Sequence, residues 1–134
     1  FRAFDADDSV RVVVLAAEGP AFCAGADLHW MKRMAGYTRE ENLSDAAALG
    51  EMLRTIATCR KPTIARVQGD AYAGGVGLVA ACDIAIGART ATFRLSEVKI
   101  GIIPSMISPY VIGAIGERHS RRYMLSGEEF DCAE

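Results

Sequence analysis

The segment GDAYAGGVGLVAACDIAIG, residues 69–87, surrounds one tyrosine with glycine and alanine and then becomes continuously apolar. We interpret residues 69–75 as a loop, residues 76–82 as a helix of small residues, and residues 84–86 as a short strand. Small side chains let a helix pack tightly on a sheet. The segment therefore predicts a glycine-rich turn followed by a helix that lies close to a sheet.

A second stretch, AFCAGADL at 21–28, repeats this arrangement. It follows an apolar, β-branched run at 10–16, just as the glycine-rich segment at 69–75 follows a similar run at 63–67. We expect both runs to be strands covered on both faces. Where a strand end leads into a helix start, backbone N–H groups have no intrahelical acceptor. Two such turns on neighbouring strands can direct two N–H donors at one oxygen, which is the geometry of an oxyanion hole. Tight packing is the alternative reason for the glycines, and a phosphate loop is excluded because neither glycine spacing nor a following lysine fits.

The rest of the chain predicts alternating strands and helices. Helices are expected at 28–34, from the Thr38 and Glu41 capping box to about residue 59, at 108–115, and from 117 to the residue before Gly127. Short strands are expected at 84–86 and 90–94, with Glu97 on the loop that follows. This alternation indicates an α/β layered structure with a largely parallel sheet.

Composition narrows the function. The chain has 134 residues, is 51% hydrophobic and has a net charge of -2, which fits one modest globular domain. Without a block of Lys or Arg we expect no nucleic-acid partner, and without an apolar run of membrane length we expect no membrane association. Four cysteines without C-x-x-C spacing indicate reduced thiols and a cytoplasmic location, and two histidines make a metal site improbable. The acidic start argues against a signal peptide, and the absence of an initiator Met suggests a piece of a longer protein.

AFCAGADL, then GDAYAGGVGLVAACDIAIG, then ATFRLSEVKIGIIP resembles, in order and spacing, the enoyl-CoA hydratase/isomerase (crotonase) family over essentially the whole chain. The resemblance implies a crotonase-like ββα spiral of the ClpP/crotonase type. Residues 1–134 would be the central part of one acyl-CoA-binding domain, without the family's N-terminal strand region and C-terminal helices. It also implies an acyl-CoA thioester substrate, no separate cofactor, and a homotrimer or hexamer.

The family's site residues can be carried over by position. The resemblance places the two oxyanion donors at the backbone N–H groups of Ala24 and Gly74. It places Gly25, Ala26, Asp27, Leu28 and Gly75 along the bound substrate, largely through main chain. These positions are the candidate substrate-binding residues.

The acid and base are the point at which this sequence departs from the family's hydratases. One of their two glutamates falls on Glu97, the candidate catalytic acid/base, whose pKa we expect burial to raise. The other falls on Gly77, which has no side chain to position water. Asp70 could take its place, although a simple turn role is the more economical reading.

The segment PSMISPY, 104–110, also departs from the family, because many relatives have a glycine-rich run there. We expect Met106 and Ile107 to reshape the acyl pocket. In appearance the chain is similar to bacterial methylglutaconyl-CoA and carboxygeranoyl-CoA hydratases, which implies a branched, carboxylated substrate and a role in leucine breakdown. Arg94 or Lys99 could pair with the extra carboxylate, or be solvated cations.

The expected function is therefore an enoyl-CoA hydratase with one glutamate acid/base. The first alternative is an enoyl-CoA Δ3,Δ2-isomerase with Glu97 as sole proton shuttle, because moving a double bond needs one base and no water. The second is a non-catalytic relative that binds acyl-CoA or RNA, against which the acidic charge balance argues for the RNA case.

Overall fold

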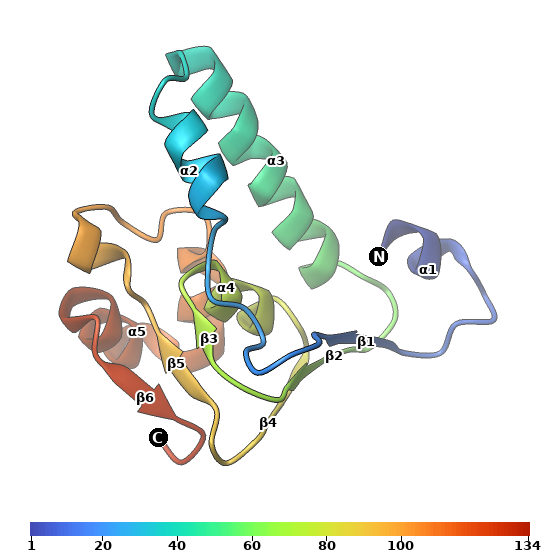
Figure 1. The fold of residues 1–134 in the computed structure, drawn as a ribbon. Helices are drawn as coiled ribbons and strands as arrows, with labels where there is room; N and C mark the ends of the chain where they lie inside the picture. The colour runs from blue at the N-terminus through green and yellow to red at the C-terminus, as the bar shows by residue number, and fades with distance from the viewer.

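The computed structural model describes all residues 1–134 and contains two three-stranded sheets with helices packed between and around them (Figure 1). In chain order the elements are α1 (Arg2–Ala6), β1 (Val13–Ala16), α2 (Leu28–Met34), α3 (Arg39–Ala57), β2 (Thr63–Val67), β3 (Ala71–Tyr72), α4 (Gly74–Ala80), β4 (Ile84–Gly87), β5 (Thr92–Arg94), the 3-10 helix η1 (Glu97–Ile100), α5 (Ser108–Ser126) and β6 (Glu129–Asp131).

The first sheet has the strand order β1-β2-β4 and is parallel throughout. Val13 pairs with Thr63, and Ile64 with Ile84. The predicted strand at 10–16 is too long, because β1 begins only at Val13, whose N–H donates to the Pro62 carbonyl at 2.9 Å. The partner strand β2 itself begins at Thr63, so residues 10–12 have no strand to pair with.

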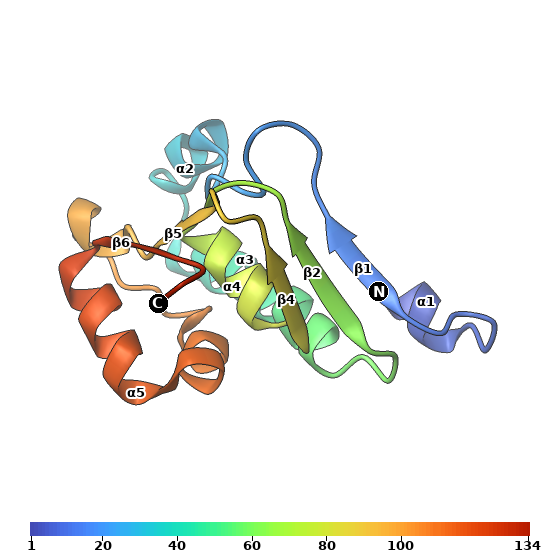
Figure 2. The same ribbon diagram turned by 90° about the horizontal axis from the view of Figure 1, so that it is seen from below.

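Only one face of this sheet is covered, which corrects the expectation that both faces would be. Helix α4 packs against β2, with Val79 in the same buried apolar cluster as Ala65 and Val67, and Figure 2 shows α3 and α4 on the same side of the sheet. On the other face, every second residue of a strand points outward, and several of these side chains are apolar and exposed. Ile84 and Ile86 of β4 are 48% and 58% exposed.

The second sheet, β3-β5-β6, holds the two glycine-rich turns. Strands β3 and β5 run parallel, and β6 pairs antiparallel with β5. The predicted loop at 69–75 is therefore wrong at Ala71–Tyr72, which form β3 because Cys23 bridges Ala71 on one side and β5 pairs on the other. Strand β6 has no counterpart in the sequence prediction, and β5 begins at Thr92 rather than residue 90.

The helices agree with the prediction more closely. Helix α3 has the expected capping box at Thr38 and Glu41, and α5 is divided by non-helical backbone at Gly116 (φ 76°, ψ 163°), where two helices were predicted. Helix α4 covers 74–80 rather than 76–82, because Gly74 and Gly75 are already helical. The short helix α1 was not predicted. The larger of two apolar clusters joins these helices, and its buried members are Leu53, Ile56, Val76, Ala81, Leu95, Ile107, Val111 and Tyr123.

Candidate active site

The first turn leaves the second sheet at Cys23. The carbonyl of Asp70 accepts the N–H groups of Phe22 and Cys23 at 3.0 and 3.1 Å, and the Tyr72 N–H donates to the Cys23 carbonyl at 2.8 Å. Ala24 follows this bridge directly, and Gly25 turns the chain with a φ of 104° that favours glycine. The first turn is therefore fixed against β3 up to the residue before Ala24.

Asp27 ends the first turn as the N-cap of α2. Its Oδ1 accepts the N–H groups of His29 at 2.7 Å and Trp30 at 2.9 Å. The hydrogen bond from Trp30, then that from His29, lowers the pKa of Asp27 below its ordinary value. Ala26, Asp27 and Leu28 are exposed. Asp27 thus has a structural task that is separate from the predicted contact with substrate.

The second turn passes from β3 into α4 through strained backbone at Ala73. Ala73 has φ 49° and ψ -116°, and its N–H donates to the Arg94 carbonyl of β5 at 2.8 Å. A non-glycine residue in this region stores backbone strain, which is common at functional sites. Gly74 follows as the first helical residue.

The two turns lie in contact, and Gly75 makes that contact possible. A Cβ added at Gly75 would lie 2.6 Å from the Cys23 carbonyl oxygen and 2.9 Å from the Cys23 Cβ, so no other residue fits without movement. On the other side of the contact, a Cβ at Gly25 would lie 3.5 Å from the Ala73 Cβ. The structure therefore brings the predicted turn residues 23–25 and 73–75 together.

The backbone donors of this contact are unused within the protein. The N–H groups of Ala24 and Gly74 donate to none of the turn, loop or cap carbonyls, and Gly74, at the start of α4, has no intrahelical acceptor. Ala24 is exposed and Gly74 half-buried, so an external acceptor can approach. Two free donors on touching turns suit an oxygen that gains negative charge.

Glu97 lies in η1 and not on an open loop as predicted. It is 8% exposed, and its buried Oε2 has no hydrogen-bond partner. Burial raises the pKa of Glu97 above its ordinary value, partly opposed by a hydrogen bond from its own backbone N–H. The Arg94 carbonyl accepts the Ala73 N–H, and Glu97 lies three residues after Arg94. The Cα atoms of Arg94 and Glu97 are therefore at most about 11 Å apart. Glu97 thus provides a buried carboxyl group with one oxygen that has no partner, a short way along the chain from Arg94.

The place of a side chain at position 77 is taken by Ile107. A Cβ at Gly77 would overlap the Ile107 Cγ2 and lie 2.6 Å from the Ile107 Cβ, and Ile107 is 3% exposed. Met106 likewise packs against a glycine. A Cβ added at Gly50 of α3 would lie only 2.7 Å from the Met106 Cε. The two bulky residues singled out in 104–110 therefore face two glycines on the neighbouring helices.

The other charged candidates already have partners inside the chain, except Lys99. Arg94 forms an ion pair with Glu129 at 2.9 Å, and its guanidinium lies 5.8 Å from the centre of the Tyr72 ring. The Asp70 Oδ1 accepts the N–H and hydroxyl of Thr92 at 3.1 and 2.9 Å. Asp70 thus has the turn role that the sequence favoured. Lys99 is exposed and makes no ion pair.

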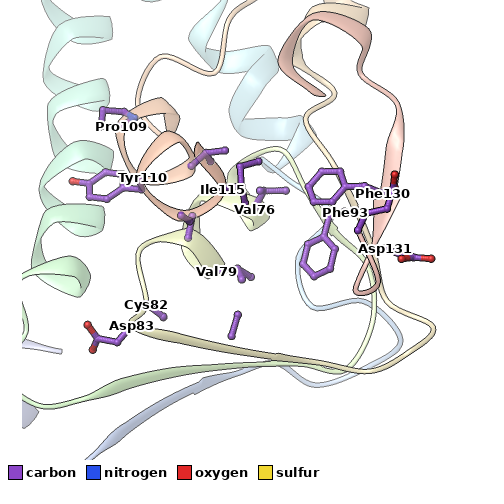
Figure 3. A pocket seen from close by; sticks show the side chains of 16 residues that line it. Val76, Val79, Cys82, Asp83, Phe93, Pro109, Tyr110, Ile115, Phe130 and Asp131 are labelled. Carbon is purple, nitrogen blue, oxygen red and sulfur yellow. The ribbon is translucent and has the colours of Figure 1, made fainter. Parts of the chain in front are cut away.

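A cavity lies away from the two turns, between α4, α5 and the second sheet (Figure 3). It measures about 700 Å³ and is lined mostly by apolar side chains, among which Val76, Val79, Phe93 and Phe130 point into the same space. None of the predicted site residues lines it. No group of three His, Cys, Asp or Glu side chains is arranged to hold a metal ion, and none of the helices combines the length and hydropathy that a bilayer crossing requires.

Touching backbone turns with free donors are suited to binding an oxygen that gains negative charge, and the same α/β fold buries a glutamate three residues after Arg94. The family described as enoyl-CoA hydratase/isomerase matches residues 1–134, so the chain belongs to the enoyl-CoA hydratase/isomerase (crotonase) family.

Relatives and solved structures agree with this assignment. A Legionella pneumophila protein that carries the family name enoyl CoA hydratase/isomerase (crotonase) is 53% identical, with a TM-score of 0.96 over 98% of this chain and 51% of its own. An enoyl-CoA hydratase from Shewanella pealeana is 45% identical, with a TM-score of 0.95 over 98% of this chain and 50% of its own. Enoyl-CoA hydratase ACTT6 of Alternaria alternata is 37% identical over 96% of this chain and 41% of its own. The chain thus spans about half the length of the relatives it matches.

Two features of the site were not visible in the sequence. The strain at Ala73 depends on its bond to Arg94, which is distant in the chain. The fit of Ile107 over Gly77 depends on how α5 packs against α4. The only signal for the second feature was the coincidence of a missing side chain at 77 with a bulky residue at 107.

Proposed function

We propose that the protein is an enoyl-CoA hydratase, in which the backbone N–H groups of Ala24 and Gly74 hold the thioester oxygen of an acyl-CoA. The observation that supports this most directly is the contact between the two turns, each with an unused donor. Loss of one such donor typically costs about 3 to 4 kcal/mol in the transition state. Gly25, Ala26, Leu28 and Gly75 would lie along the substrate with Asp27.

In the proposed reaction the water oxygen bonds to the β-carbon of the enoyl group while Glu97 takes a proton from that water. The electron pair of the double bond moves to the thioester oxygen, where the two N–H groups stabilise the enolate. Glu97 then returns the proton to the α-carbon, and the enolate collapses to the hydroxyacyl thioester. A buried carboxyl group with a raised pKa is suited to both proton transfers near neutral pH.

The isomerase is a second candidate, and the Gly77–Ile107 contact favours it. An apolar side chain occupies the space where a second carboxyl group would orient water. In an isomerase, Glu97 would remove a proton from the α-carbon of a 3-enoyl thioester and return it to the γ-carbon. This route needs one carboxylate and no water.

We further propose a branched or carboxylated acyl group of the methylglutaconyl type, because the bulky Met106 and Ile107 stand where many relatives have a glycine-rich run. Since Arg94 is paired with Glu129, Lys99 is the better candidate partner for an extra carboxylate. From the resemblance to the family we also propose a homotrimer or hexamer. Light scattering of the full-length protein tests this oligomeric state. The half-buried, unbridged Cys23, Cys59 and Cys82 support a cytoplasmic location.

Incubation of the full-length protein with crotonyl-CoA, 3-methylglutaconyl-CoA and cis-3-hexenoyl-CoA in oxygen-18 water separates the two reactions. Hydration incorporates labelled oxygen into the product, whereas isomerisation of hexenoyl-CoA does not change its oxygen content. Glu97→Gln should lower kcat about 100-fold or more on the active substrate. The matched control Glu117→Gln, at an exposed side chain of α5, should have no effect. Activity of Glu97→Gln within threefold of the parent would rule out the acid/base assignment.

A further inference from the structure

We infer that Asp70 is a positioning residue that sets how the two backbone turns lie relative to each other. This inference rests on the proposed function, because it concerns the placement of the Ala24 and Gly74 donors. Asp70 precedes β3 and contacts the segments on both sides of it, the first turn and β5. It does so with its main chain on one side and its side chain on the other.

The main chain of Asp70 fixes the first turn. One carbonyl accepts two N–H groups, from Phe22 and Cys23, which are the two residues before Ala24. A carbonyl oxygen has two lone pairs, so this oxygen is fully used. The direction in which the chain arrives at Ala24 therefore depends on the peptide group between Asp70 and Ala71, together with the Tyr72 N–H that donates to the Cys23 carbonyl.

The side chain of Asp70 fixes that peptide group to β5. Both bonds from Thr92, its N–H at 3.1 Å and its hydroxyl at 2.9 Å, end on the same oxygen, Oδ1. The Thr92 hydroxyl also lies 2.9 Å from the Tyr72 hydroxyl, so Thr92 of β5 is hydrogen-bonded both to Asp70 and to Tyr72 of β3. These three side chains join the start of β3 to the start of β5.

Strand β5 in turn holds the second turn. The Arg94 carbonyl, two residues after Thr92, accepts the N–H of the strained Ala73 just before Gly74. Asp70 thus joins the approach to Ala24 and the support of Gly74, in addition to the backbone pairing of β3 with Cys23 and β5. A shift of a fraction of an ångström at either donor weakens a transition-state hydrogen bond strongly, because such bonds depend on preorganised geometry.

The test compares Asp70→Ala with Asp70→Asn in the full-length protein. Asp70→Ala keeps the carbonyl but removes both bonds to Thr92, and kcat should fall at least tenfold with KM changed by less than threefold. Asp70→Asn should keep kcat within threefold of the parent, because the amide oxygen can accept both bonds at the Oδ1 position. Thr92→Val removes only the hydroxyl and should give an intermediate loss, and it replaces Asp70→Ala if that variant does not fold.

A matched control lies in the other sheet. The Asp83 Oδ2 accepts the N–H and hydroxyl of Thr63, both at 2.8 Å, at the opposite end of α4 from Gly74. Asp83→Ala removes the same kind of contact and should lower the melting temperature while kcat stays within twofold. A purely structural role of Asp70 would make the two alanine variants behave alike.

Cinnamoyl-CoA gives a readout that does not need turnover. Hydrogen bonds to its conjugated thioester carbonyl shift its absorbance to longer wavelength, and Asp70→Ala should reduce this shift while Asp83→Ala should not. A parent protein that neither turns over the acyl-CoA substrates nor shifts cinnamoyl-CoA would overturn the proposed function and this inference together. An active parent whose Asp70→Ala variant keeps both kcat and the shift would overturn the inference about Asp70 alone.

Discussion

Glu97 has no partner for its buried Oε2, and this has a consequence for stability. Burial raises the pKa of Glu97 in the folded protein above the unfolded value of about 4.3. The folded state therefore binds the proton more tightly than the unfolded state does. The resulting stabilisation is fully present below the unfolded pKa and is lost as the pH rises through the folded pKa.

Replacing Glu97 by Gln should therefore change stability in a pH-dependent way. We expect Glu97→Gln to match the parent below about pH 4 and to become the more stable of the two as the pH approaches 7, because the parent must then bury a charge. Urea unfolding of both proteins over this range measures the difference. Glu117→Gln, at an exposed site, should follow the parent at every pH. A Glu97→Gln variant that is clearly less stable at pH 7 would mean that an unrecognised donor stabilises the carboxylate.

The same group predicts the acid side of the rate profile. Glu97 must be ionised to accept a proton, so kcat should fall on the acid side with an apparent pKa above about 4.3. A kcat profile between about pH 4 and 9 checks this, with circular dichroism over the same range to confirm that the protein stays folded. A profile that is flat down to about pH 4.5 would contradict the raised pKa.

At the scale of elements, local patterns in the sequence predicted the helices well and the second sheet poorly. Asp27, Thr38 and Pro62 act on their own neighbours, so α2, α3 and β2 begin at the residues expected for them. Strand β3 has two residues, and its existence depends on Cys23 and Phe93, which are distant in the chain. No period can be read from so short a strand.

The candidate site divides in the same way. The residue pattern indicated the two turns and the family resemblance indicated Glu97; the structure brings the turns together, while the catalytic roles stay predictions. The contact of Gly75 with Cys23 and the strain at Ala73 are long-range features that residue patterns do not encode. The coverage of the first sheet was overestimated, because apolar runs such as 63–67 fit a strand with one exposed face as well as a buried one.

The packing of α4 on α5 makes a testable prediction about Gly77 and Ile107. Gly77→Ala should destabilise the protein by about 1 to 3 kcal/mol, because the added Cβ would overlap Ile107 in a packed core. In an Ile107→Ala background the same change should cost much less, since the obstructing side chain is gone. Gly113→Ala on α5 is the control, because nothing lies within 4 Å of its Cβ, and it should stabilise by about 0.5 to 1 kcal/mol.

Denaturant unfolding of the four proteins in the Gly77 and Ile107 cycle measures the coupling energy. Additive effects of the two substitutions would contradict the contact. A strong coupling would also explain why an acidic side chain cannot simply be placed at position 77 in this chain.

At the scale of the whole molecule, the outward face of the β1-β2-β4 sheet exposes apolar side chains on both sides of one arginine, Arg66. Val14, Ile84 and Ile86 are 52%, 48% and 58% exposed, and β4 lies at an edge of its sheet. Apolar side chains on an unprotected edge strand favour association with another chain. Other exposed apolar side chains lie in residues 98–103 and singly on helices, as Leu125 of α5 illustrates at 76%.

Residues 1–134 prepared as a separate chain should therefore self-associate through this face. Burying the exposed half of one isoleucine contributes on the order of 1 kcal/mol, so replacing both Ile84 and Ile86 by Lys should weaken association about thirtyfold. Sedimentation equilibrium measures the change, and binding of a dye specific for apolar surface should fall in parallel. Leu125→Lys removes a still more exposed apolar side chain from α5 and should leave the association constant unchanged. If Leu125→Lys disperses the chain as well as the double variant does, the association is a general effect of added charge and the β4 face has no special part in it.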